Sequence, residues 1–196
     1  MPDEELIVAD ADAWRRWLES HGTTVDSAWL VLARKGVTDP TSLSYDQALD
    51  EALCFGWIDG QKASRDSRTY LQRFTPRRAR SPWSARNVEL VDRLVADGRM
   101  TSAGQLAIDQ AKADGRWEQA YGGQATMAVP AELADALEAN GQAAAMFEIL
   151  TKQNRFAILY RIHSAKREQT RTRRVEQFVA MLARGETIYP QKRQLP

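Results

Sequence analysis

Two short blocks, close together in the chain, constrain the fold most strongly. The first is Leu53–Gln61, which reads LCFGWIDGQ, and the second is Arg73–Ser84, which reads RFTPRRARSPWS. Gly56 indicates the end of a helix, directly before the apolar beginning of a strand. The second block ends a strand and contains Ser81–Pro82, a pair typical of a helix start. The blocks therefore read as junctions between helix and strand, and the chain must contain both.

The first half of the chain combines helices with short strands. Asp10 or Asp12 can cap a helix whose last turn ends at Gly22, where we expect the left-handed conformation that glycine adopts easily. The apolar run 29–33 is too short for a helix and indicates a buried strand. Ser44 is typical of the N-cap of the helix that runs into the first block. Together with the strands that the two blocks delimit, these segments predict a small antiparallel sheet.

The second half reads as helix almost throughout. Apolar side chains recur there at helical spacing, and Gly98, Gly115 and Gly185 mark helix ends. We therefore predict an α+β fold, in which a small antiparallel sheet with packed helices is followed by a mainly helical C-terminal half.

The domain boundaries follow from the glycine-rich stretch Tyr121–Gln124, the best linker candidate in the chain. We predict an α+β domain over 1–120, which carries both blocks, a linker over 121–129 and a helical domain over 130–190. The tail after Tyr189 is expected to fray.

The composition is that of a globular protein in a reducing compartment. The 196 residues include one cysteine, Cys54, so no internal disulfide can form, and we interpret Cys54 as a buried, unreactive thiol. The N-terminal residues 1–5 are acidic, whereas an export signal needs a basic start and an apolar stretch. The sequence has no stretch that is long and apolar enough to span a membrane. We therefore expect a cytoplasmic protein.

The net charge of +1 conceals four alternating charged segments. Residues 1–64 carry −7 and residues 65–99 carry +5, followed by −5 over 100–151 and +7 over 152–174. The basic segments can neutralise the acidic ones across the fold, which is the interpretation that we favour. They can also form one positive surface for nucleic acid, provided that both lie on the same side of the molecule.

Aromatic, acidic and basic side chains gather in the two blocks. Solvated loops rarely combine Trp with Asp, and hydrophobic cores rarely contain Arg. The concentration of these residue types in the two blocks therefore predicts a binding or active site. Guanidinium groups can hold an anion there, and Asp59 can act as a general base or bind a cation. The same charges can instead lock the sheet to the helices, which we place first. The candidate site residues are Trp57, Asp59, Arg73, Arg77, Arg78 and Trp83.

A second group of basic residues lies in the C-terminal half. Arg161, His163, Arg171 and Arg174 fall in or beside the most basic segment and form a candidate second patch. Two histidines and one cysteine, far apart in the sequence, provide no zinc-ligand spacing, and the chain has no glycine-rich phosphate loop. We therefore predict neither a metal nor a cofactor.

Ordered motifs along the chain resemble a known bacterial family. Besides the two blocks they include GRMT at Gly98–Thr101, GRW at Gly115–Trp117, NRF at Asn154–Phe156 and TRTRR at Thr170–Arg174. From Trp14 to Leu182 the chain resembles the YdeI/OmpD-associated proteins. The resemblance implies bacteriocin or antimicrobial-peptide protection and a link to an outer-membrane porin. It brings no catalytic residue and no substrate.

These observations predict a cytoplasmic binding or stress-protection protein that holds an anionic small molecule or a protein partner at the two blocks. One alternative is a small-molecule enzyme that uses Asp59 with Arg73 or Arg77, in a cleft lined by Trp57 and Trp83. A second alternative is a nucleic-acid-binding protein that uses both basic segments. The sequence leaves open whether the protein is an enzyme.

Overall fold

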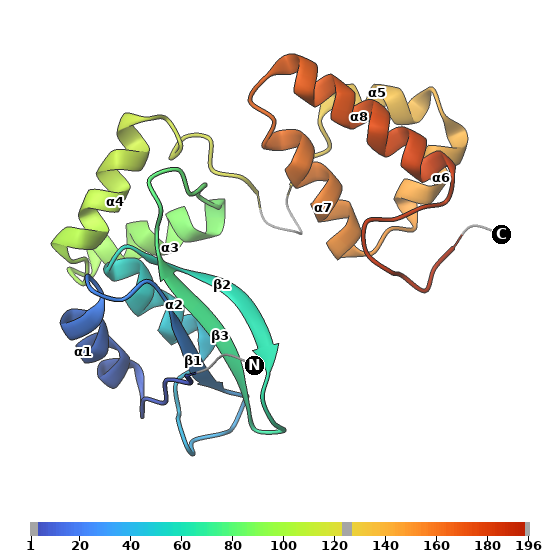
Figure 1. Cartoon of the computed structure of the whole chain (residues 1–196). Coiled ribbons are helices and arrows are strands. Elements are labelled where there is room, and N and C mark those ends of the chain that lie inside the picture. Colours follow the sequence, from blue (N-terminus) through green and yellow to red (C-terminus); the bar gives the residue numbers. More distant parts are fainter. Residues whose placement is uncertain (1–3, 123–126, 195–196) are drawn as a thin grey trace. The chain divides into compact units, whose positions relative to one another are not determined.

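The computed structural model describes residues 4–122 and 127–194 (Figure 1). In chain order the described elements are α1 (Ala11–His21), β1 (Ala28–Ala33), α2 (Tyr45–Cys54), β2 (Trp57–Ser64), β3 (Thr69–Pro76), α3 (Ala85–Ala96), α4 (Ser102–Ala113), α5 (Ala131–Glu138), α6 (Gly141–Glu148), α7 (Lys152–His163) and α8 (Glu168–Ala183). The strands lie in the first half and the second half is helical, which confirms the predicted α+β fold. None of the described helices combines the length and the apolar character needed to cross a membrane.

The chain forms two compact units. Unit 1 takes in the residues up to Trp83 together with Asn87–Ala120, and unit 2 takes in Ser84–Arg86 together with the residues from Tyr121 onward. The predicted linker at 121–129 includes residues 123–126, which lie outside the described residues.

The sheet of unit 1 has the strand order β1-β3-β2, with both pairs antiparallel. Leu6 extends the β1 edge, because its N–H donates to the Trp29 carbonyl at 2.8 Å and its carbonyl accepts from the N–H of Val31 at 2.9 Å. At the other edge, β2 carries a register shift between Asp59 and Lys62. Among the described strands, β2 therefore has a neighbour on one side only.

The helix ends in unit 1 follow the sequence signals in most places. Asp10 caps α1, and Ser44 forms a capping box with Gln47 at the start of α2. Gly56 has a φ of 73° and lies between the end of α2 and the beginning of β2. That left-handed conformation turns the chain directly from the helix into the sheet.

The prediction of a left-handed Gly22 is wrong, since its φ is −61°. Glycine is required there for a different reason. A Cβ atom at this position would lie 2.5 Å from the Leu18 carbonyl oxygen. The Trp57 indole N–H also donates to the Gly22 carbonyl at 3.0 Å, so α1 and the start of β2 meet at this residue.

The prediction that Pro82 opens a helix is also wrong, because α3 begins at Ala85. A helix from Pro82 would need the carbonyls of Ser81 and Pro82 for its own first bonds. Arginines occupy both: Arg116 donates to Ser81 at 2.8 Å and Arg77 donates to Pro82 at 3.2 Å. The segment before α3 is therefore an arginine-bound loop.

The core of unit 1 lies between the sheet and its helices and is rich in aromatic rings. Trp14 contacts the rings of Trp17, Trp57 and Phe74, with centroid distances of 5.1, 6.3 and 5.8 Å. Buried leucines complete this core, among them Leu18, Leu30, Leu32, Leu49 and Leu53. Their burial ties α1 and α2 to one face of the sheet.

Unit 2 packs α5, α6, α7 and α8 around Leu133, Phe147, Ile158, Phe178 and Leu182. The fully buried Asn154 connects this bundle to the C-terminal tail.

The Asn154 side chain donates to the Tyr189 carbonyl at 2.9 Å and accepts from the Tyr189 N–H at 2.8 Å. It also donates to Gln191, whose side chain accepts from the Thr151 N–H. The tail is therefore held in place up to Gln191, so the expectation that it frays directly after Tyr189 is wrong for these residues.

Candidate functional site

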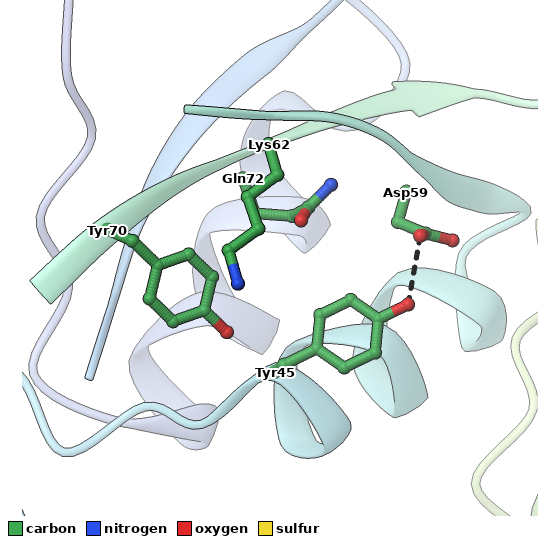
Figure 2. Close-up of a pocket in the computed structure, with 5 residues that line it drawn as sticks. All are labelled: Tyr45, Asp59, Lys62, Tyr70 and Gln72. Carbon is green, nitrogen blue, oxygen red and sulfur yellow. Dashed lines mark hydrogen bonds between the residues drawn. The ribbon is translucent and has the colours of Figure 1, made fainter. Parts of the chain in front are cut away.

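Three elements of unit 1 surround a cavity of about 290 Å³ (Figure 2). Tyr45 comes from the first turn of α2, Asp59 and Lys62 come from β2, and Tyr70 and Gln72 come from β3. We call this site the Asp59 pocket.

The register shift in β2 brings Asp59 and Lys62 to the same side of the sheet. Residues three apart on a regular strand face opposite sides. Here Asp59 pairs with Phe74 and Lys62 pairs with Gln72, so β3 advances two residues while β2 advances three. The irregularity in β2 therefore places an acid and a base over one cavity.

Hydrogen bonds fix the walls of the pocket. The Tyr45 hydroxyl donates to Asp59 Oδ2 at 2.9 Å, as Figure 2 shows. The buried Gln72 amide donates to the carbonyls of Gly60 and Gln61 at 3.0 and 3.2 Å, which satisfies the backbone at the register shift. Burial raises the pKa of Tyr70, the charge of Asp46 raises it further, and Arg34 opposes both.

Lys62 lies over an aromatic ring rather than beside a carboxylate. Its ammonium nitrogen is 4.1 Å from the Tyr70 ring centroid, and Figure 2 shows the side chain extending into the space between Tyr70 and Tyr45. Among the described residues Lys62 and Asp59 form no ion pair within 4.0 Å. The pocket therefore holds two opposite charges apart.

A second feature of unit 1 is the arginine loop, Arg77–Trp83, between β3 and α3. The Arg77 guanidinium carbon lies 3.6 Å from the Trp83 ring centroid, a close cation–π contact. Trp83 is 2% exposed and packs on Trp117 at 4.8 Å. Within the described part of the chain, the Trp83 indole N–H has no hydrogen-bond acceptor.

The structure brings together only some of the residues predicted for the first site. Arg77 and Trp83 stack on one another, and Arg78 is exposed beside them. Trp57 is buried in the aromatic core instead, and Asp59 faces Tyr45.

Arg73 lies on the sheet face opposite the Asp59 pocket, because side chains alternate along β3 and its neighbours Gln72 and Phe74 share the face of Asp59. Among the described residues, no ion pair joins Asp59 and Arg73. The acid–arginine pair that an enzyme at this site would use is therefore not assembled from these two residues.

The candidate basic patch in unit 2 is largely engaged within the unit. Arg174 donates to the Arg161 carbonyl and to the Ser164 hydroxyl, and Arg161 donates to the Ala157 carbonyl at 2.9 Å. These cations lie at the C-terminal end of α7, where they complement the helix dipole.

Of the other two members, Arg171 lies 3.5 Å from Glu132, and His163 is exposed. The whole second basic segment lies in unit 2, whereas all of the first except Ser84–Arg86 lies in unit 1.

The sequence reasoning missed a charged cluster centred on Glu51, which we call the Glu51 ion cluster. Glu51 is 4% exposed and accepts from Arg15 at 2.9 Å and from Arg99. Beside it, Asp50 accepts from Arg93 at 2.7 Å. The signal that could have revealed the cluster is a glutamate inside an otherwise apolar helix face.

Cys54 lies next to this cluster and is fully buried. Burial raises the pKa of the Cys54 thiol, and the negative charge of Glu51 raises it further against the opposing charges of Arg99 and Arg15. These influences favour the protonated, unreactive thiol at neutral pH.

Two family models match the chain. Residues 6–107, slightly more than half of the chain, match a family described as a domain of unknown function (DUF8412). Residues 126–185 match the family described as Bacteriocin-protection, YdeI or OmpD-Associated, which confirms the resemblance for the C-terminal part. Comparisons with curated proteins and with solved structures gave no match. The chain therefore belongs to the family of the DUF8412 domain, and its C-terminal segment matches the YdeI or OmpD-associated bacteriocin-protection family.

Proposed function

We propose that this chain is a binding protein of the bacteriocin-protection type, and that its arginine loop holds an anionic small molecule or an anionic group of a partner. The C-terminal family match supports the protection role. We further propose that the protein acts in the cytoplasm, which fractionation of cells that produce the tagged chain would test.

The buried indole N–H of Trp83 carries the proposal for the loop. A buried donor without an acceptor costs about 1–3 kcal/mol, so an acceptor in that place would be strongly favoured. The Arg77 guanidinium lies directly over the same ring. An anion bound there would supply the acceptor that Trp83 lacks and meet a positive charge.

The loop is also held in shape before any ligand arrives. The backbone N–H of Arg77 donates to the Gly56 carbonyl at 2.8 Å, and the backbone N–H of Arg78 donates to the Ser81 hydroxyl at 3.1 Å. Arg80 is exposed in the same turn and adds to the positive field. A fixed loop loses little conformational freedom on binding, which favours affinity.

Trp83→Phe tests the proposal, because phenylalanine keeps an aromatic ring under Arg77 but has no N–H. Inorganic phosphate serves as the probe, measured by calorimetry at low salt. We expect phosphate to bind the variant about tenfold more weakly, the factor that corresponds to one lost hydrogen bond to an anion. Without ligand, the free energy of unfolding should fall by about 1–2 kcal/mol, because Trp83 is 2% exposed and the smaller ring leaves a cavity beside Trp117.

Trp117→Phe is the matched control, because it changes the other ring of the same aromatic pair. It should keep the affinity for phosphate. In a bacteriocin-sensitive host, the natural chain and the control should raise survival, and Trp83→Phe should not. Equal phosphate affinity in both variants, or equal protection by both, would refute the role of the loop.

A further inference from the structure

We infer that the Asp59 pocket is a second binding site, and that its ligand is a small zwitterion with one ammonium and one carboxylate group, such as a free amino acid. This site uses none of the residues of the arginine loop. The inference therefore goes beyond the proposed function and stands independently of it.

The separated charges of the pocket carry the inference. Asp59 and Lys62 line one cavity, and each is held by a neutral aromatic residue: Tyr45 donates to Asp59, and Tyr70 lies under the Lys62 ammonium. Two opposite charges in contact near a protein surface attract each other, and each then partly neutralises the other. Keeping them apart leaves a carboxylate and an ammonium that a ligand with both charges can bridge.

A ligand with a single charge fits this arrangement less well. A simple anion that reaches Lys62 also meets Asp59, and a simple cation that reaches Asp59 also meets Lys62. The surroundings add one charge of each sign, because Arg34 lies 5.7 Å from the Tyr70 ring and Asp46 acts on the same tyrosine. The pocket therefore discriminates by the separation of charges rather than by net charge.

The size and the walls of the cavity limit the ligand to a small molecule. A volume of about 290 Å³ lies at the low end of small-molecule sites. The rings of Tyr45 and Tyr70 provide apolar contact, and the Gln72 amide donors already bond the carbonyls of β2. A molecule of amino-acid size matches both limits.

The experiment compares free L-amino acids with two derivatives of each, by calorimetry on the whole chain. The set covers small, aromatic and charged side chains. The N-acetyl derivative lacks the ammonium charge, and the amide derivative lacks the carboxylate charge. We expect at least one free amino acid to bind at least about tenfold more tightly than both of its derivatives, because each loses a charge-assisted bond.

Two variants assign the charges to residues. Asp59→Asn should abolish the preference over the N-acetyl derivative, and Lys62→Gln should abolish the preference over the amide. Lys112→Gln is the matched control, because Lys112 also lies over an aromatic ring, at 5.1 Å from the Trp117 centroid, but outside the pocket. This control should keep both preferences.

Three results would overturn the inference: no free amino acid binds, the derivatives bind as tightly as the free form, or both pocket variants keep both preferences. Trp83→Phe should leave amino-acid binding unchanged. Phosphate binding at the arginine loop and amino-acid binding at the Asp59 pocket can thus fail separately.

Discussion

The Glu51 ion cluster has its carboxylates on α2, and the Asp59 pocket has its carboxylate on β2 next to that helix, yet the two sites differ in how their charges are paired. Glu51 is almost fully buried and accepts from two arginines. Asp59 borders an open cavity and accepts from a tyrosine, with Lys62 held apart from it. The charge of Glu51 therefore holds the fold together, whereas the charges of Asp59 and Lys62 remain available to a ligand.

Solvent access explains the difference. A carboxylate that has lost its water must be paired, so α1 and the segment before α4 supply Arg15 and Arg99 to Glu51. Asp59 keeps access to the cavity and needs no cation in contact with it. Burial therefore decides which of the two acids is structural.

Glu51→Gln should have the largest effect, because it leaves two arginines without their buried partner. We expect the free energy of unfolding of unit 1 to fall by about 3 kcal/mol, at the low end for a broken buried ion pair, since Arg15 and Arg99 are 30% and 37% exposed. Urea unfolding followed by tryptophan fluorescence measures it, because all six tryptophans lie in unit 1.

Glu19→Gln is the matched control for that experiment. Glu19 pairs with the same Arg15 at 3.5 Å but is 53% exposed. It should change the free energy of unfolding by no more than about 0.5 kcal/mol. If the two glutamate variants lose the same free energy of unfolding, Glu51 contributes no more to stability than an exposed glutamate, and the structural role of the Glu51 ion cluster is refuted.

Gly104→Ala should disturb the same region by a steric route. A Cβ atom at Gly104 would lie 2.3 Å from the Cys54 carbonyl oxygen and 2.4 Å from the Met100 sulfur. The start of α4 must then move away from α2, and Thr101 loses its bonds to Cys54. We expect a loss of about 2 kcal/mol in the same unfolding experiment.

Gly60→Ala provides the comparison at the pocket. A Cβ atom there would make an ordinary contact of 3.6 Å with the Arg73 carbonyl, so its effect should stay within about 0.5 kcal/mol. If both alanine variants lose the same free energy of unfolding, the close approach of Gly104 to the Cys54 carbonyl does not contribute to the stability of this region.

Local signals in the sequence predicted the elements well. The capping residues Asp10 and Ser44, and Gly56 at the helix-to-strand junction, act over a few residues and appear as expected. Gly22 and Pro82 were misread because tertiary contacts decide them: Trp57 reaches the Gly22 carbonyl, and an arginine takes the Pro82 carbonyl.

The sites were harder to predict than the elements. Alternation along β3 separates Arg73 from Asp59, but the position of Lys62 depends on a register shift that no turn signal announces. Tyr45 lies fourteen residues before Asp59 and meets it only after α2 packs on the sheet. The proximity of Arg77 and Trp83 could be predicted from the sequence, because both residues lie in one short loop.

Asp59→Asn should destabilise unit 1 less than Glu51→Gln or Gly104→Ala. The Tyr45 hydroxyl can donate to an amide oxygen as it does to a carboxylate, so the free energy of unfolding should fall by no more than about 1 kcal/mol. Combining it with Lys62→Gln should give additive losses, because the two charges do not touch. A loss as large as that of Glu51→Gln, or strong coupling with Lys62, would make Asp59 a structural ion like Glu51. A small, additive loss leaves the charges of the pocket free to act on a ligand.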